Sequence, residues 1–450
     1  MLVAALGAAR SRTGLVLAAV AGACLLRGPE PFIWDARLYW GASVTVASGG
    51  AVPLEDPAFY SVRGALSGVT FLPAALLSRV AGGQFAGTAV LLQNALLIGV
   101  VAAVLVPALA RPWRALDPPR RWLAAGLTWA ALQGFAPYPL MDLYATAAVL
   151  GAVALLGGPG RPGAPPRAGS LVGAGLLLGY GFAVRPALLP VAVLLLLVTA
   201  ASERSRAALA LGGFAAALLP QVVRTATDAG RFSLLPDAAG AVAALQTRYG
   251  AYVVRYDTVP TRAQPSQFFC SPGMAEHVGT PPGTTTDLLL LLLRHPADSA
   301  PFVLQKVATA LHWPLAVPYA DPHPGADALV AVGTTALVLL GCGHLIAAAW
   351  ARRHDPAGPR WAGLRVLAVL AGTLAVLAAS APEPRFALPL VVLGVAGVAA
   401  AAGSRPAGSA HRVRAWAAAA LVVAVVALGW SGLAHPAPPG LASPAACAAA

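Results

Sequence analysis

The stretch QFAGTAVLLQNALLIGVVAAVLVPAL, residues 84–109, contains no charged side chain. A helix of about 20 apolar residues spans the hydrocarbon core of a bilayer, so this stretch predicts a transmembrane helix. Similar apolar runs recur at residues 3–26, 122–136, 140–157, 169–184, 186–200, 207–223, 326–350, 363–381, 386–402 and 414–432. The sequence therefore predicts an all-α protein, a polytopic transmembrane helical bundle of about 11 spans.

The composition excludes an ordinary water-soluble domain. Of the 450 residues, 58% are hydrophobic and only 10% are charged. The net charge of +13 could indicate a nucleic-acid partner, but the arginines cluster in short connections without interleaved aromatic residues. We therefore expect a membrane environment and no nucleic-acid partner.

The arginine clusters alternate along the chain with arginine-poor connections. They lie at residues 10–12, 111–121, 161–167, 204–206, 352–365 and 405–414. Cytoplasmic loops carry the excess of Lys and Arg, so the N-terminus is predicted to be cytoplasmic. Of the 17 acids, all but Asp117, Glu203 and Asp355 then fall on the outer side, which predicts an outward active face.

Arginine is strongly preferred over lysine, and Lys306 is the only lysine. Together with the abundance of Ala, Gly and Pro, this preference is typical of a GC-rich bacterial genome. The predicted location is a bacterial cytoplasmic membrane, which the chain crosses several times.

Two long outer segments are predicted, at residues 27–83 and 224–325. The first includes ALSGVTFLPAALLSRV, residues 65–80, which is amphipathic enough to lie on the membrane surface. The second includes residues 287–313, which predict one or two interfacial helices or a re-entrant pair, broken at Pro296. We expect one transmembrane domain over residues 1–432 and a disordered outer tail over residues 433–450.

The four cysteines divide into two pairs by environment. Cys24 and Cys342 lie in apolar runs, whereas Cys270 and Cys447 are both predicted to lie outside. The outer two could form a disulfide, but the sequence leaves the pairing open.

The first candidate site residue is Asp35, in WDARLYW, residues 34–40, directly after the first apolar run. One interpretation is a solvated acid among aromatic interfacial anchors. The other is a general base that takes a proton from an acceptor hydroxyl. Helical spacing places Tyr39 on the same helix face as Asp35, as a supporting residue.

Asp142, in MDLYATAAVL, residues 141–150, is placed in a similar way, at the start of an apolar helix after a short outer turn. Stabilisation by the helix dipole alone would explain it. Because both acids lie at outer helix ends, the more specific hypothesis is that they belong to one shared site. They could bind a divalent cation, although two carboxylates without fixed spacing are a weak metal signal, and no nucleotide-binding motif is present.

Three arginines are candidate phosphate ligands. Arg185 interrupts an apolar run beside Pro186 and must reach either an interface or an anion. Arg385 lies at an outer turn. The simpler interpretation is an ion pair with Glu383, and the more specific one is a contact with a lipid phosphate. Arg224 follows the seventh apolar run on the same predicted side.

In this order, the motifs resemble the GT-C superfamily of membrane glycosyltransferases. The resemblance rests on WDARLYW (34–40), MDLYATAAVL (141–150), GYGFAVRPALLP (179–190) and PRFALPLVVL (384–393), with weaker likeness at residues 218–236 and 294–314. The chain differs from many members in having a single acid, Asp35, in place of two adjacent acids. It also has Phe386 where many have tyrosine.

The resemblance implies an inverting enzyme that moves a sugar, with mannose favoured, from a polyprenyl-phosphate donor to an acceptor hydroxyl of a lipid, glycan or protein. Asp35 would act as the base or position it, and Asp142 would assist or bind a cation. The leaving phosphate would be stabilised by the arginines 185, 385 and 224, with Glu383 and Tyr39 supporting. The alternative is a non-catalytic lipid-binding or polyprenyl-phosphate transport protein on the same scaffold. An enzyme should gather these residues at one outward cavity, whereas a transporter should show a polar path to the cytoplasmic side.

Overall fold

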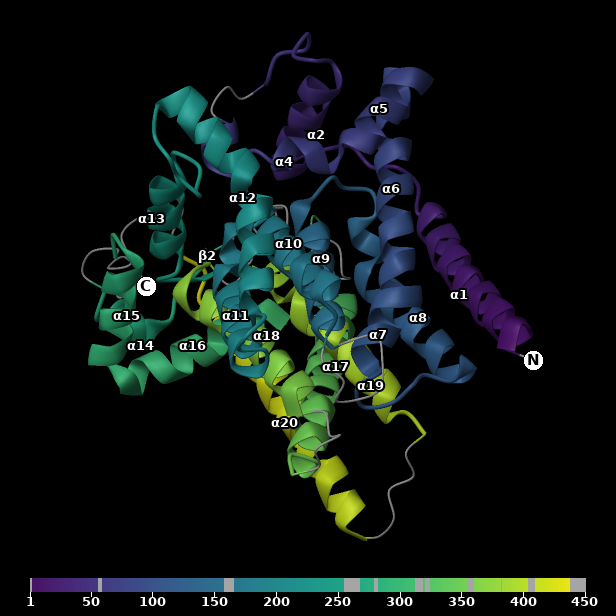
Figure 1. Cartoon of the computed structure of the whole chain (residues 1–450). Helices are drawn as coiled ribbons and strands as arrows, with labels where there is room; N and C mark the ends of the chain where they lie inside the picture. Colours follow the sequence, from purple (N-terminus) through teal and green to yellow (C-terminus); the bar gives the residue numbers. More distant parts are fainter. Residues whose placement is uncertain are drawn as a thin grey trace.

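The computed structural model describes residues 2–55, 59–157, 166–254, 268–278, 282–311, 319, 324–354, 360–381, 383–403 and 409–437. These residues form a helical protein in which two short strands pair (Figure 1). The all-α architecture predicted from the apolar runs is confirmed.

Each predicted apolar run coincides with one helix or with helical segments that continue one another. These are α1 (Leu2–Leu25), α6 (Ala86–Val100) with η2 (Val101–Leu105) and α7 (Val106–Ala110), α8 (Pro118–Leu132), α9 (Met141–Leu156), α10 (Ala168–Val184), η4 (Pro186–Leu188) with α11 (Leu189–Ser202), α12 (Ala207–Ala229), α17 (Pro324–Ala351), α18 (Arg360–Ala379), η5 (Pro384–Ala387) with α19 (Leu388–Ala401), and α20 (Ser409–Gly432).

Five helical stretches in the described part of the chain are long and apolar enough to cross a membrane. They are Gly83–Ala110, Ala207–Asp228, Ala328–Ala351, Arg360–Ala379 and Pro384–Ala401. Large apolar side chains also face outward from the bundle, including Trp416 (75% exposed), Val423 (67%) and Leu197 (60%). Apolar surface of this kind fits a lipid environment, so the fold is that of an all-α membrane bundle. The count of about 11 spans stays a prediction.

The remaining elements are short and belong mainly to the two predicted outer segments. They are α2 (Trp34–Ala47), α3 (Phe59–Arg63), α4 (Ser67–Thr70), α5 (Leu72–Ala81), η1 (Gly83–Phe85), η3 (Gln133–Phe135), α13 (Ala239–Tyr249), β1 (Val253–Val254), β2 (Phe268–Phe269), α14 (Pro272–Ala275), α15 (Thr285–Arg294) and α16 (Pro296–Leu311). The helix break expected at Pro296 is confirmed, because α15 ends at Arg294 and α16 begins at Pro296.

Glycines allow two pairs of helices to approach closely. A Cβ atom on Gly175 of α10 would lie 2.0 Å from the carbonyl oxygen of Ala210 on α12. A Cβ atom on Gly341 of α17 would lie 2.1 Å from the carbonyl oxygen of Gly394 on α19. Association of helices in a membrane depends on such small-residue contacts, because lipid supplies no hydrophobic drive between helices.

The beginning of the predicted disordered tail is ordered. The amide of Cys270 donates to the carbonyl of His435, and the amide of Ala437 donates to the carbonyl of Phe268. The edge of β2 that does not pair with β1 makes these backbone hydrogen bonds, which composition alone does not reveal. Residues 438–450 lie outside the described residues. Cys270 is disulfide-bonded, Cys24 and Cys342 are free, and Cys447 lies outside the described part of the chain.

The two ends of the bundle differ in chemistry. At one end the Arg120 Nε donates to the carbonyl of Ala402 (2.7 Å), and the Trp113 indole donates to the carbonyl of Leu345 (2.8 Å). We call this end, with residues 111–121, 345–353 and 402–403, the arginine-rich end. Helices α2 and α4 lie at the opposite end, the upper end of the view in Figure 1. The predicted topology assigned these two groups to opposite sides of the membrane.

Candidate functional site

The first turn of α2 presents Asp35 to two arginines. Its Oδ1 accepts a hydrogen bond from Arg63 Nη2 at 2.7 Å, and its Oδ2 accepts from Arg385 Nη2 at 3.2 Å. The residue before it, Trp34, has φ of 49°, a left-handed conformation that is uncommon for an aromatic residue. The helix therefore starts in a strained conformation next to the carboxylate.

Asp142 lies in the first turn of α9 and is held by Arg185, which follows the last residue of α10. Arg185 Nε lies 2.8 Å from Asp142 Oδ1, and the two residues are only 7% and 3% exposed. Helix α10 ends here because the proline at 186 disfavours helical geometry in the residue before it. The break leaves the guanidinium inside the bundle rather than in solvent.

The turn at η5 joins these two ion pairs. Arg385 Nε donates to Glu383 Oε2, as the simple ion-pair interpretation predicted. The same guanidinium also places Nη1 3.9 Å from Asp142 Oδ2, and Arg185 Nη2 lies 3.9 Å from Glu383 Oε2. Arg385 thus contacts three carboxylates from three separate parts of the chain.

Together these residues form what we call the charge cluster. It contains three carboxylates and three guanidinium groups, so its formal charges balance: Asp35, Asp142, Glu383, Arg63, Arg185 and Arg385. Buried charges persist only when they are paired. Three polar atoms of the charge cluster are buried without a hydrogen bond: Asp142 Oδ2 and the Nε and Nη2 of Arg185.

Aromatic rings line the charge cluster. Tyr39 is 1% exposed, and the Arg63 guanidinium lies 5.6 Å from the centre of its ring. The Arg185 guanidinium lies 4.9 Å from the centre of the Phe386 ring. The Tyr319 hydroxyl is buried without a hydrogen-bond partner, and burial raises the pKa of Tyr319. These rings shield the ion pairs from water and add cation–π attraction.

An asparagine fixes the turn that leads into α9. Asn94 Nδ2 donates to the carbonyls of residues 135, 136 and 138 at 3.3, 3.1 and 2.8 Å. Its Oδ1 accepts from the Tyr144 hydroxyl at 2.8 Å. These bonds tie the turn of residues 135–138 to α6 and to α9, and so fix the helix start that carries Asp142.

The neighbouring arginines control the ionisation of Asp35. Burial alone would raise the pKa of the Asp35 carboxyl, but Arg63, Arg385 and Arg185 outweigh burial and lower this pKa to about 2. A base works best when its pKa lies near the working pH. In the ligand-free protein, Asp35 is therefore a poor proton acceptor and a strong anchor for Arg63 and Arg385.

The structure brings together most of the residues predicted from sequence, but it places Arg224 elsewhere. The Arg224 guanidinium lies 4.0 Å from the centre of the Tyr60 ring, and its Nε is 3.2 Å from Asp228 Oδ2. Arg63 takes a place in the charge cluster that sequence reasoning did not assign. Arg63 is an arginine on the predicted arginine-poor side, and this position could have marked it in the sequence as a candidate site residue.

The interior of the charge cluster is tightly filled. Asp142, Arg185, Arg385 and Phe386 line a void of about 10 Å³, which is far smaller than the roughly 300–1,000 Å³ of ordinary ligand pockets. The Asp35 and Arg63 side chains keep 20% and 27% exposure. A ligand therefore has to approach from the edge formed by Asp35 and Arg63.

The charge cluster does not fit the divalent cation considered from sequence. Each of its carboxylates already faces a guanidinium, which would repel a cation at the same oxygens. Among the described residues, no group of three or more His, Cys, Asp or Glu side chains is arranged to hold a metal ion.

Comparison with known proteins adds no assignment: no protein-family model, curated protein or solved structure matches the chain.

Proposed function

We propose that the protein is a membrane glycosyltransferase that moves a sugar, mannose in the first instance, from a polyprenyl-phosphate donor to an acceptor hydroxyl on the outer face of the cytoplasmic membrane. The observation that carries the proposal is the convergence of Asp35 and Asp142 with Arg185 and Arg385 at one end of the bundle. A lipid-linked donor diffuses in the membrane plane and needs no soluble nucleotide site.

The arginines bind and stabilise the leaving group. Guanidinium binds phosphate oxygens in a bidentate way and stabilises negative charge as it develops. The acceptor oxygen attacks the anomeric carbon, and the bond from this carbon to the phosphate oxygen breaks. The electron pair leaves on the polyprenyl phosphate, and the acceptor proton passes to a carboxylate.

Donor binding also provides a way to make Asp35 a base. Arg385, the partner of Asp35 at 3.2 Å, is one of the proposed phosphate ligands. A phosphate beside it adds negative charge near Asp35, which raises the pKa of a carboxyl group. Asp35 is then a weak base without donor and a stronger one in the donor complex.

The second candidate is a non-catalytic lipid-binding or transport protein. It is favoured by the size of the void that Asp142, Arg185 and Arg385 line, about 10 Å³, which is too small to enclose a sugar. Such a protein would bind the lipid phosphate at the arginines without turnover.

The test is transfer of radiolabelled mannose from polyprenyl-phosphate mannose by the purified chain in liposomes, with bacterial membrane extract as acceptor. We expect label in the lipid, glycan or protein fraction, and a loss of about 100-fold or more with Asp35→Asn. Arg37→Gln is the matched control, because Arg37 lies on the same helix and pairs with Glu55 at the surface, 66% exposed.

Equal transfer by Asp35→Asn and the natural chain would overturn the role of Asp35. Donor binding without any transfer would favour the second candidate.

A further inference from the structure

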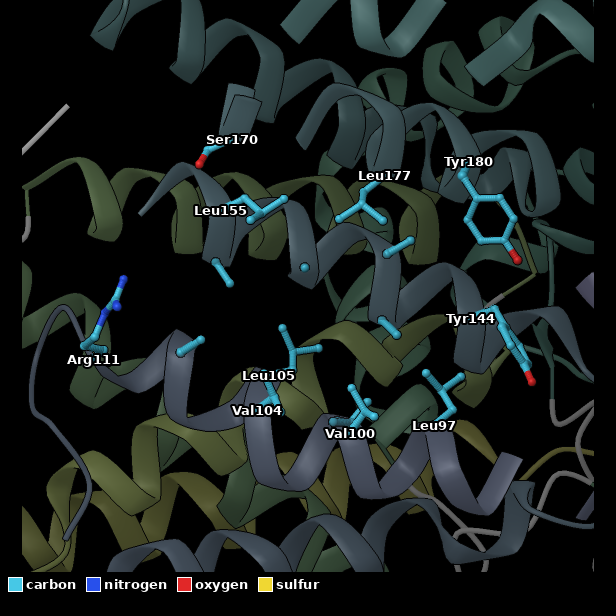
Figure 2. A pocket seen from close by; sticks show the side chains of 16 residues that line it. Leu97, Val100, Val104, Leu105, Arg111, Tyr144, Leu155, Ser170, Leu177 and Tyr180 are labelled. Atoms are coloured by element: carbon cyan, nitrogen blue, oxygen red, sulfur yellow. The ribbon is translucent and has the colours of Figure 1, made fainter. Parts of the chain in front are cut away.

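A second feature of the protein, independent of the proposed transferase activity, is an apolar pocket of about 580 Å³ on the face of α9 that carries Tyr144. Figure 2 shows Leu97, Val100 and Val104 of the α6–η2 helix on one wall and Leu155 and Leu177 on the other. Its volume lies within the range of ordinary ligand pockets. The η2 segment that forms part of this wall is π-helical, a local widening often found at functional positions.

The pocket opens sideways from the bundle. Val100, Val104 and Leu155 are 41%, 50% and 37% exposed, although they line a cavity. In a membrane protein, apolar side chains exposed in this way face hydrocarbon. A lipid chain can therefore enter from the side, without passing through water.

One end of the pocket is capped by polar side chains that bond to one another. The Tyr180 hydroxyl lies 2.9 Å from Thr70 Oγ1, and Gln93 Nε2 donates to the Tyr144 hydroxyl at 2.7 Å. Phe71 packs edge-on against Tyr144, with ring centres 5.0 Å apart. This cap separates the pocket from α4. The hydroxyl groups of Tyr144 and Tyr180 take part in hydrogen bonds within the cap.

The other end of the pocket carries positive charge. Arg111 lies there, opposite Ser170, as Figure 2 shows. A smaller void of about 10 Å³ adjoins it, shares Ala108, Arg111 and Ala154 with it, and is also lined by Arg365. Arg365 is only 5% exposed, and its Nε is buried without a hydrogen bond. Its charge, which Glu203 partly offsets, adds to the positive potential at this end of the pocket.

From these features we propose that the pocket binds one anionic phospholipid from the leaflet at the arginine-rich end. Its phosphate lies against Arg111, beside the void that Arg365 lines, and one acyl chain fills the cavity up to the tyrosine cap. Leu97 and Arg111 are separated along a continuous helix by roughly 20 Å, slightly more than the roughly 15 Å of hydrocarbon in one leaflet. Basic pockets between transmembrane helices are suited to anionic headgroups.

The same geometry argues against the sugar donor as occupant. On α9, Asp142 belongs to the charge cluster whereas Tyr144 lines the pocket, and residues two apart on a helix point to different faces. For a lipid with its phosphate at Arg185 or Arg385, the tyrosine cap closes the direct path from the phosphate to this cavity. The phosphate ligands of the pocket therefore lie at the opposite end.

The experiment is native mass spectrometry of the full chain, titrated in detergent with palmitoyl-oleoyl phosphatidylglycerol or with phosphatidylcholine of the same chains. We expect phosphatidylglycerol to bind at least tenfold more tightly. Arg111→Gln should weaken it about fivefold. Arg114→Gln is the matched control, because Arg114 lies in the same connection without lining the pocket.

A second pair of variants tests whether the acyl chain of the lipid occupies the cavity. Ala147→Phe fills the cavity and should abolish the strong binding, whereas Ala130→Phe adds the same ring at an exposed position on α8 and should leave it unchanged. Equal binding of the two phospholipids, or equal effects of Arg111→Gln and Arg114→Gln, would overturn the proposal. So would retention of undecaprenyl phosphate in preference to phosphatidylglycerol.

Discussion

Arg385 and Asp35 are 350 residues apart in the chain, yet Arg385 Nη2 donates to Asp35 Oδ2 at 3.2 Å. This contact links the first and the last of the motifs that resemble the glycosyltransferase superfamily. It also closes the charge cluster, because Arg385 reaches Glu383 and approaches Asp142 with its remaining nitrogens. The stability of this end of the bundle and the proposed chemistry therefore depend on the same residues.

The ion pair of Asp35 and Arg63 should be energetically coupled. Asp35→Asn and Arg63→Gln should each destabilise the fold by about 1–3 kcal/mol, because each leaves a partner uncompensated. The double variant should cost less than the sum, with a coupling of about 1 kcal/mol. Unfolding in detergent measures this cycle. The exposed pair of Arg37 and Glu55 is the control and should show about 0.5 kcal/mol or less; strict additivity at Asp35 and Arg63 would contradict the prediction.

The proposed coupling between donor and Asp35 predicts a difference between two pH profiles. The profile of kcat/KM reports the free enzyme and that of kcat reports the donor complex. Without donor the pKa of Asp35 is held at about 2, so kcat/KM should show no loss from this residue as pH falls from 7 to 5. Bound phosphate raises this pKa, so kcat should begin to fall at a higher pH. Coincident profiles would exclude the donor-induced base.

The only lysine of the chain should make stability depend on pH. Lys306, in α16 outside the candidate spans, is fully buried, and its Nζ donates to the carbonyls of Gly250 and Ala378, both at 2.7 Å. Burial lowers its pKa from 10.5 to about 7, so between these values the unfolded chain binds more protons than the folded protein. Stability should therefore rise with pH across this window and fall as pH drops towards 7.

The measurement is thermal or denaturant unfolding of the natural chain and Lys306→Met in detergent at several pH values. Between pH 7.5 and 8.5 the natural chain should gain about 1 kcal/mol relative to the variant. Parallel pH profiles for the two proteins would show that Lys306 keeps its ordinary pKa.

The contact between α17 and α19 should tolerate no side chain at Gly341. Alanine there would place Cβ 2.1 Å from the carbonyl oxygen of Gly394 and should destabilise the fold by about 1–3 kcal/mol. Gly343, two residues along the same helix, has open space around its Cα, so Gly343→Ala should be neutral or stabilising by up to about 1 kcal/mol. Unfolding of both variants in the same detergent makes the comparison, and equal stabilities would refute the close packing.

The predicted orientation can be tested by labelling. Phe232, 87% exposed in the connection after α12, is predicted to face outward, and Arg114 is predicted to face the cytoplasm. In intact bacterial cells, Phe232→Cys should react with a membrane-impermeant maleimide, and Arg114→Cys should react only after permeabilisation. The reverse pattern would invert the topology and move the charge cluster to the cytoplasmic side.

Local sequence determined the helices. Apolar runs located the long helices, and Pro186 and Pro296 marked breaks, because a proline constrains the backbone of its immediate neighbours whatever surrounds it. Acids at helix starts also singled out Asp35 and Asp142, which the fold brings to the same guanidinium, that of Arg385. The ordered residues 435–437 were missed, because their backbone bonds depend on a strand far away in the chain.

Only the tertiary structure decided which charges meet. It brought Arg63, at the end of α3, to Asp35 and left Arg224, near the end of α12, on Tyr60, although both lie on the same predicted side. It also placed Arg111 at one end of an apolar pocket and Arg365 in the wall of the adjoining void. Hydropathy predicts that a helix lies in the membrane. The rotation of that helix and the identity of its neighbours depend on close contacts such as that of Gly175 with Ala210, which no local pattern specifies.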